Sequence, residues 1–167
     1  MNRRTLSWLL PCLFFAVGLW AALLSIEKRH WLLKLPPQLG VEKVLYAKTK
    51  SLGFGPGANE TGVVLYELPA HVSDKNPSVL APQLRWEKTP LQGHREWFEG
   101  EGASRTKAGP LLYNFLNHYG FEIVVEPEVV GEIDRAVSTP GSWYAYTRDG
   151  VILLMPLINR LAYIYAG

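Results

Sequence analysis

The hydrophobic pattern separates one continuous apolar run near the start of the chain from shorter periodic segments beyond it. Residues 5–26 carry no charge, and 17 of the 21 residues in 6–26 are apolar. A 21-residue helix is about 31 Å long, which matches a hydrocarbon core of about 30 Å. We therefore expect residues 6–26 to form a single transmembrane helix, preceded by a short tail at residues 1–5.

Side chains suited to the membrane–water boundary flank this run. Indole rings prefer the boundary, where their N–H stays hydrated, and basic side chains meet lipid phosphates there. The expected membrane-interface residues are Arg3, Arg4, Trp8, Trp20, Lys28, Arg29 and Trp31. Residues 27–40 form a juxtamembrane neck, which either rests on the bilayer surface or continues the helix until Pro36 and Pro37.

A cleaved secretory signal is the main alternative to an anchor, because Arg3 and Arg4 match the basic start of such signals. Cleavage requires small residues at positions −3 and −1, but a cut after Ala22 places Trp20 at −3. The apolar run also exceeds the roughly 7–15 residues of a signal's apolar region. These features favour an uncleaved anchor.

Positive charge is nearly balanced across the expected span, with two arginines before it and Lys28, Arg29 and Lys34 after it. A very short tail with two arginines is the commoner cytoplasmic end, so we expect the folded domain outside the cytoplasm, in the periplasm if the source is bacterial. The only cysteine, Cys12, lies in the apolar run. The domain therefore has neither disulfides nor thiolate metal sites.

Residues 41–167 are predicted to form one α+β domain with a mainly antiparallel sheet and one or two packed helices. Residues 62–68 are apolar on both faces through most of their length, which indicates a central strand. An Asp-Gly pair between two strand-like segments predicts a hairpin at residues 142–155. Further strands are expected at residues 41–48 and 121–126.

Helical spacing is clearest in residues 104–119, where the apolar residues form one stripe followed by a glycine. A short helix is expected in residues 69–76, and residues 77–93 read as irregular. The tail at residues 156–167 fits both a helix and an alternating strand, and we expect the helix.

Few residues stand in arrangements that carry chemistry. Gly53, Gly55 and Ala58 follow a G-x-G-x-x-A order, but a strand comes next, and a dinucleotide site needs a helix there. His71 and Asp74 would align on a helix, where a solvated face is the default interpretation. We therefore expect no cofactor and no metal, and catalytic residues are not identified.

Acidic and aromatic residues instead suggest a binding surface. Eight acids lie between Glu96 and Asp134, against Arg105 and Lys107. This surface suits a basic partner, while exposed aromatic rings would bind proteins or sugars and buried ones would pack the core. The candidate partner-binding residues are Phe54, Trp86, Trp97, Glu126, Glu128 and Trp143.

The net charge differs in sign between the start of the chain and the rest. The formal net charge is +2, but residues 1–34 carry +4 and residues 35–167 carry −2. The basic residues suit a lipid bilayer, and no nucleic-acid partner is expected. We therefore predict a single-pass, membrane-anchored envelope protein that acts as a non-enzymatic accessory or protein-interaction module. Two alternatives stay open: a membrane-anchored hydrolase that attacks an envelope polymer through acidic residues, and a small subunit of a membrane complex.

Overall fold

The computed structural model describes residues 15, 18–20, 29–52, 59–92, 97–98, 110–117 and 122–166. The chain divides into two compact units, Met1–Lys34 and Leu35–Gly167. In the first unit, residues 29–32 are helical, and the Leu33 N–H donates to the Arg29 carbonyl at 3.1 Å. Most of the expected transmembrane segment lies outside the described residues, as do Arg3, Arg4, Trp8 and Lys28. Among the described helices, none has both the length and the apolar character needed to cross a membrane.

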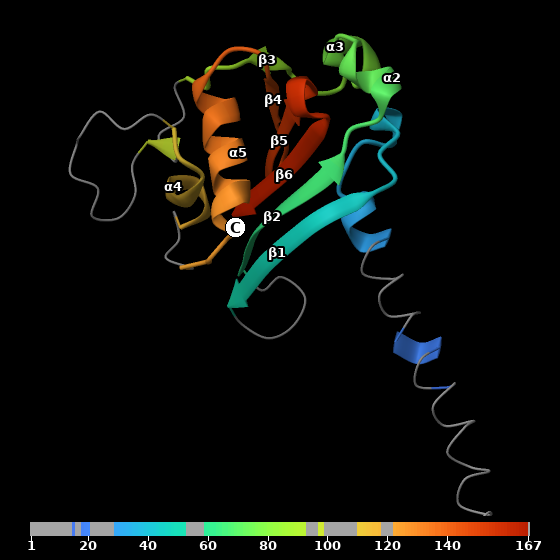
Figure 1. The fold of residues 1–167 in the computed structure, drawn as a ribbon, viewed down its shortest axis with the longest axis vertical. Coiled ribbons are helices and arrows are strands. Elements are labelled where there is room, and N and C mark those ends of the chain that lie inside the picture. Colours follow the sequence, from blue (N-terminus) through green and yellow to red (C-terminus); the bar gives the residue numbers. More distant parts are fainter. Residues whose placement is uncertain are drawn as a thin grey trace, which may run out of the picture. The chain divides into compact units, whose positions relative to one another are not determined.

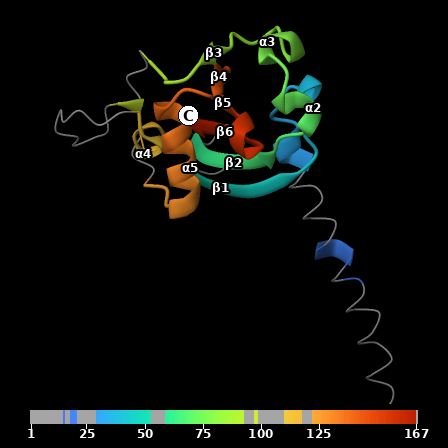
Figure 2. The same ribbon diagram turned by 45° about the horizontal axis from the view of Figure 1, so that its top comes forward.

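The second unit is built on a six-stranded antiparallel sheet, and the predicted α+β class is confirmed (Figures 1 and 2). Its strands are β1 (Val44–Leu52), β2 (Asn59–Glu67), β3 (Glu87–Lys88), β4 (Trp143–Tyr146), β5 (Gly150–Met155) and β6 (Arg160–Ala166). Their order across the sheet is β1-β2-β6-β5-β4-β3. The last strand of the chain therefore lies in the middle of the sheet, paired with β2 and β5.

Three strand predictions are confirmed. The expected strand at residues 41–48 corresponds to β1, and the expected central strand corresponds to β2, which has a neighbour on each side. The predicted hairpin is formed by β4 and β5, and the Thr147 N–H donates to the Gly150 carbonyl at 2.8 Å where the chain turns. In each case the strand or turn that the local sequence pattern predicts is the one that the structure forms.

The helix expected at the C-terminus is wrong. Residues 156–166 form a short 3-10 turn, η3 (Pro156–Ile158), followed by β6. Asn159 adopts a left-handed conformation with φ 53° and redirects the chain from the turn into the strand. Strand β6 pairs with β2 along one edge and with β5 along the other, and its side chains are buried on both faces of the sheet. Pairing within the sheet therefore prevails over helical spacing.

Two helices, α4 (Leu112–Leu116) and α5 (Pro127–Ser138), pack on one face of the sheet. Figures 1 and 2 show them together on one side, with the short helices α2 (Ala70–Ser73) and α3 (Pro77–Leu80) on the other. The apolar core between sheet and helices includes Val63, Leu65, Phe115, Leu116, Ile133, Val137, Leu153 and Ile164. A further short helical element is the 3-10 turn η1 (Pro37–Leu39).

The opposite face of the central strands is also buried and is rich in tyrosine. Tyr163 and Tyr165 stack with ring centroids 5.3 Å apart, and burial raises the pKa of both phenols. Glycines of the neighbouring strands, Gly62 and Gly150, face Tyr165 across the sheet. A Cβ at Gly62 would lie 2.7 Å from the Tyr165 hydroxyl, so these glycines make room for the ring.

The predicted helix at residues 104–119 is much shorter among the described residues. Only Leu112–Leu116 is helical, Leu111 is extended, and residues 104–109 and 118–119 lie outside the described part. The longer helix is α5, which the sequence reading missed. Pro127 opens α5, and its buried side chains recur at helical spacing: Val129, Ile133, Ala136 and Val137.

The strand expected at residues 121–126 is not part of the sheet. Ile123 and Val125 are buried while Glu122, Val124 and Glu126 are exposed, as in a half-buried strand. However, the backbone of this segment forms hydrogen bonds with side chains of α4 and of the residue after it. The Ile123 N–H donates to Asn117 Oδ1 at 3.1 Å, and the Val125 N–H donates to the Tyr113 hydroxyl at 3.3 Å.

Shorter elements follow their local sequence. The helix expected within residues 69–76 corresponds to α2. Residues 77–93, expected to be irregular, contain α3 and β3. Asn76 caps α3, because its side-chain oxygen accepts a hydrogen bond from the Ser78 N–H at 3.0 Å.

Candidate functional site

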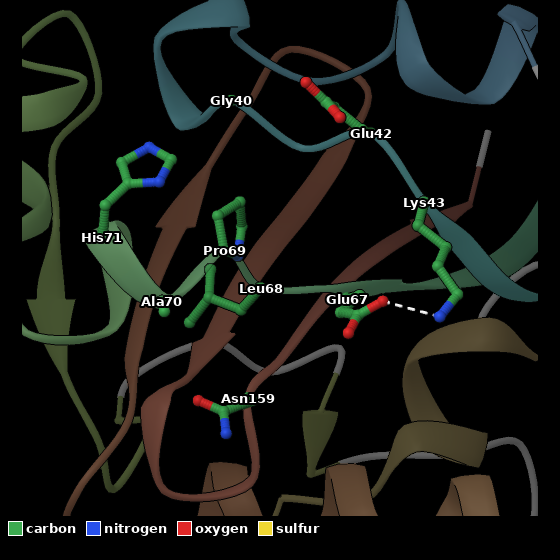
Figure 3. A pocket seen from close by; sticks show the side chains of 9 residues that line it. All are labelled: Gly40, Glu42, Lys43, Glu67, Leu68, Pro69, Ala70, His71 and Asn159. Carbon is green, nitrogen blue, oxygen red and sulfur yellow. Dashed lines mark ion pairs between the residues drawn. The ribbon is translucent and has the colours of Figure 1, made fainter.

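A polar cavity of about 580 Å³ opens where β2 ends and where β1 and β6 begin (Figure 3). We call it the end cleft. Three separate segments of the chain meet there: the residues before β1, the junction between β2 and α2, and the turn before β6. Its lining residues are Gly40, Glu42, Lys43, Glu67, Leu68, Pro69, Ala70, His71 and Asn159.

Backbone hydrogen bonds hold the three segments of the end cleft together. The Glu67 N–H donates to the Lys43 carbonyl, and the Leu68 N–H donates to the Asn159 carbonyl, both at 3.0 Å. The Asn159 side chain is fixed as well, since its Oδ1 accepts from the Ser73 hydroxyl at 2.9 Å. These hydrogen bonds therefore fix the walls of the cleft relative to one another.

Gly40 determines how closely the imidazole of His71 approaches the chain. This glycine has a left-handed φ of 59°, which ends η1. A Cβ at Gly40 would lie 3.3 Å from two atoms of the His71 ring. Glycine therefore permits both the turn and the position of the imidazole at the side of the cleft.

Two carboxylates, of Glu42 and Glu67, and one ammonium, of Lys43, line the end cleft. Lys43 Nζ pairs with Glu67 Oε2 at 2.8 Å, and the hydrogen bond and charge of Lys43, with a smaller contribution from Arg160, lower the pKa of the Glu67 carboxyl. Glu42 is exposed and has no ion pair among the described residues. Among the described residues that line it there is no serine, threonine, cysteine or tyrosine. These described residues provide ionic and hydrogen-bonding groups, and none of them is a hydroxyl or thiol nucleophile.

A second polar surface surrounds the start of α5. We call residues 122–128 the acidic segment. Glu122, Glu126 and Glu128 are exposed there and have no ion pair within the described part of the chain, and the side chain of Val124 is 75% exposed. The Tyr113 hydroxyl donates to the Val125 carbonyl at 3.1 Å and helps fix this segment against α4.

A small apolar groove of about 100 Å³ lies beside η3. Leu157 and Ile158 line it together with parts of α5, and the Leu157 side chain is 84% exposed. Gly141 adopts a φ of 119°, and a Cβ there would lie 3.1 Å from Leu157. Exposed apolar residues on a tight turn are suited to protein contact, although nothing near this groove defines the chemistry of an occupant.

The structure separates the predicted partner-binding residues into buried and exposed groups. Trp86 and Trp97 are buried core side chains: the Trp86 indole donates to the Ala81 carbonyl at 3.1 Å, and Trp97 packs on Phe115. Trp143 is half-buried, with Lys88 Nζ 5.0 Å from its ring centroid. Glu126 and Glu128 are exposed and belong to the acidic segment.

Of the remaining predicted site residues, Phe54 lies outside the described residues, together with Gly53, Gly55 and Ala58. Among the expected membrane-interface residues, Trp20 and Arg29 are exposed and Trp31 is buried. His71 and Asp74 are both exposed, and within the described ranges no group of three His, Cys, Asp or Glu side chains could hold a metal ion. Sequence reasoning missed the end cleft because its residues form no local motif and meet only in the fold.

Neither a protein-family model, nor a curated protein, nor a solved structure matches this chain.

Proposed function

We propose that the chain is a single-pass, membrane-anchored and non-enzymatic interaction module that binds a basic protein partner through its acidic segment. Residues 6–26 would be the anchor, and the unit Leu35–Gly167 would act outside the cytoplasm. The observation that carries the proposal is the exposed apolar side chain of Val124 beside three carboxylates that make no ion pair in the described part of the chain. The Lys50 ammonium lies nearby, but it donates to the backbone carbonyl of Glu122 at 3.3 Å and not to its carboxylate.

The chemistry of this surface defines its partner. Carboxylates on a surface steer a basic partner toward them, while a central apolar contact supplies affinity once water is excluded. Part of the role of Glu126 and Glu128 is local, because acids at a helix N-terminus stabilise that helix. Glu122 precedes the helix, with a φ of 49° outside any regular element, and this local role does not apply to it.

The positions of Asp134 and Glu132 give less support to the hydrolase alternative. A glycosidase needs two carboxyl groups on opposite sides of the scissile bond. Asp134 instead accepts the Leu112 N–H at 2.7 Å, and Glu132 Oε2 lies 3.9 Å from Arg160 Nε. Two acids of the cluster therefore have partners within the fold.

Site-specific photocrosslinking in native membranes tests the proposal. A photoreactive residue replaces Val124 in the full chain, and the same residue replaces Val79 as a control, because the two valines are 75% and 76% exposed. We expect one adduct of defined mass from position 124 only. Its yield should fall at least about tenfold when Glu122, Glu126 and Glu128 are changed to glutamine, since three charge contacts are lost.

Two results would contradict the proposal. One is equal adduct formation from positions 124 and 79, which would indicate nonspecific collision. The other is an adduct at position 124 whose yield is unaffected by the triple glutamine substitution. Circular dichroism of the triple variant provides the folding control, because loss of α5 would also remove the adduct.

A further inference from the structure

We infer that the end cleft is a binding site for a small aliphatic cation, a compound with an ammonium or guanidinium group on a short carbon chain. The site is separate from the acidic segment. It is formed by residues 40–43, residues 67–71 and Asn159, whereas the acidic segment comprises residues 122–128.

The size and floor of the cleft suit such a compound. A volume of about 580 Å³ lies within the range of small-molecule sites, roughly 300–1,000 Å³. Figure 3 shows Leu68 and Pro69 between His71 on one side and Glu67 on the other. Leu68 is only 2% exposed, so the carbon chain of a ligand would lie against Pro69 and Ala70 while its ends reach polar groups.

The charges of the cleft favour a cation over an anion. The ammonium of Lys43 is already engaged by Glu67 at 2.8 Å, which leaves Glu42 as the lining carboxylate without an ion pair among the described residues. An ionised carboxylate has about four acceptor positions, so Glu67 can accept from a ligand while it stays paired with Lys43. An anion would meet both carboxylates. Lys43 is engaged by Glu67, and Arg160, whose charge also acts on Glu67, does not line the cleft and pairs with Glu132 at 3.9 Å.

The cleft is also pre-organised. Its three segments are joined by the hydrogen bonds from Glu67 to Lys43 and from Leu68 to Asn159, and Ser73 holds the Asn159 side chain. A ligand would not have to order these walls, and binding would be correspondingly less costly in entropy. Asn159 and His71 add polar side chains that can set the orientation of the ligand.

Titration of the full chain in detergent micelles, followed by amide NMR, tests this site. Agmatine is the cationic probe, 1-pentanol is a neutral comparator and glutarate is an anionic one. We expect saturable shifts of the Leu68, Ala70 and His71 amides with agmatine alone. Glu42→Gln should weaken agmatine binding at least about fivefold, because it removes the unpaired charge while keeping the side-chain shape.

Glu126→Gln serves as the matched control, since it removes an equally exposed carboxylate from the acidic segment and should leave agmatine binding unchanged. The inference is overturned if agmatine gives no saturable shift, if 1-pentanol or glutarate gives the same shifts, or if both glutamine variants weaken binding equally. Because the photocrosslink at Val124 is measured at another surface, its success or failure is independent of these outcomes.

Discussion

The central strands and the helical segment, residues 110–117 and 122–138, share one core but are specified in different ways. In β2, β5 and β6, the interior residues 61–66, 151–155 and 161–165 are buried, and their sequence is mainly apolar on both faces. The pattern within each strand is therefore enough to indicate its place in the sheet. In the helical segment, single polar side chains determine where the chain turns. Asn117, Tyr113 and Asp134 bind backbone groups 6, 12 and 22 residues away.

This difference explains which elements could be predicted. An apolar pattern identifies buried strands because burial is its direct cause. It cannot show that an alternating segment such as residues 122–126 will bond to the side chains of a neighbouring helix. The fold of the helical segment depends on contacts that have no local signature, and its predicted boundaries were accordingly wrong.

The largest expected effect comes from the central strands, at the point where β5 begins. Gly150 of β5 pairs with Tyr165 of β6, and a Cβ there would collide with the Ile164 carbonyl and lie 2.8 Å from Tyr165 Cβ. Neither neighbour can move freely, because both belong to the middle of the sheet. We expect Gly150→Ala to destabilise the full chain by about 3 kcal/mol in chemical denaturation.

Gly131→Ala is the matched control for this substitution. Gly131 is exposed in the middle of α5, and a Cβ there meets nothing within 4 Å. Because alanine favours the helix, stability should rise by about 0.5–1 kcal/mol. A mild effect at Gly150, comparable in size to that at Gly131, would contradict the view that close packing between β5 and β6 specifies the central strands.

The same contrast applies to the candidate sites. Glu126 and Glu128 were predicted as partner-binding residues because charge is visible in the sequence, and both are exposed. The exposure of an aromatic residue is not visible there, and Trp97 is fully buried. The end cleft was not foreseen, because Glu42, Glu67 and Asn159 are far apart in the chain and none carries a motif.

An intermediate effect is expected where the two regions join. Thr61 of β2 is fully buried, and its hydroxyl lies 3.1 Å from the Leu116 carbonyl at the end of α4 and 3.0 Å from the Tyr165 carbonyl of β6. Thr61→Val keeps the shape but leaves these buried acceptors without this donor. We expect a loss of about 1–2 kcal/mol in the free energy of unfolding.

Thr49→Val in β1 is the comparison for that loss, because Thr49 is exposed and lies in the same sheet. Its effect should stay within about 0.5 kcal/mol. If both valine variants were equally stable, the hydrogen bonds of the Thr61 hydroxyl would not contribute to the packing of α4 on the strands. Apolar packing alone would then account for their association.

The smallest effect is expected inside the helical segment, at Asp134. Burial raises the pKa of this carboxyl, and the hydrogen bond from the Leu112 N–H opposes that shift only in part. A raised pKa means that the folded state holds the proton more tightly, so this group's contribution to stability falls as pH rises from the unfolded pKa through the folded one.

Asp134→Asn keeps an acceptor for Leu112 but cannot ionise. The stability difference between variant and wild type, measured by denaturation from pH 3 to 7, should therefore shift in favour of the variant with rising pH, by less than about 1 kcal/mol because the site is partly solvated. A shift in the opposite direction would show that the charged hydrogen bond to Leu112 outweighs the burial of Asp134, and that the helical segment depends on charge as well as on geometry.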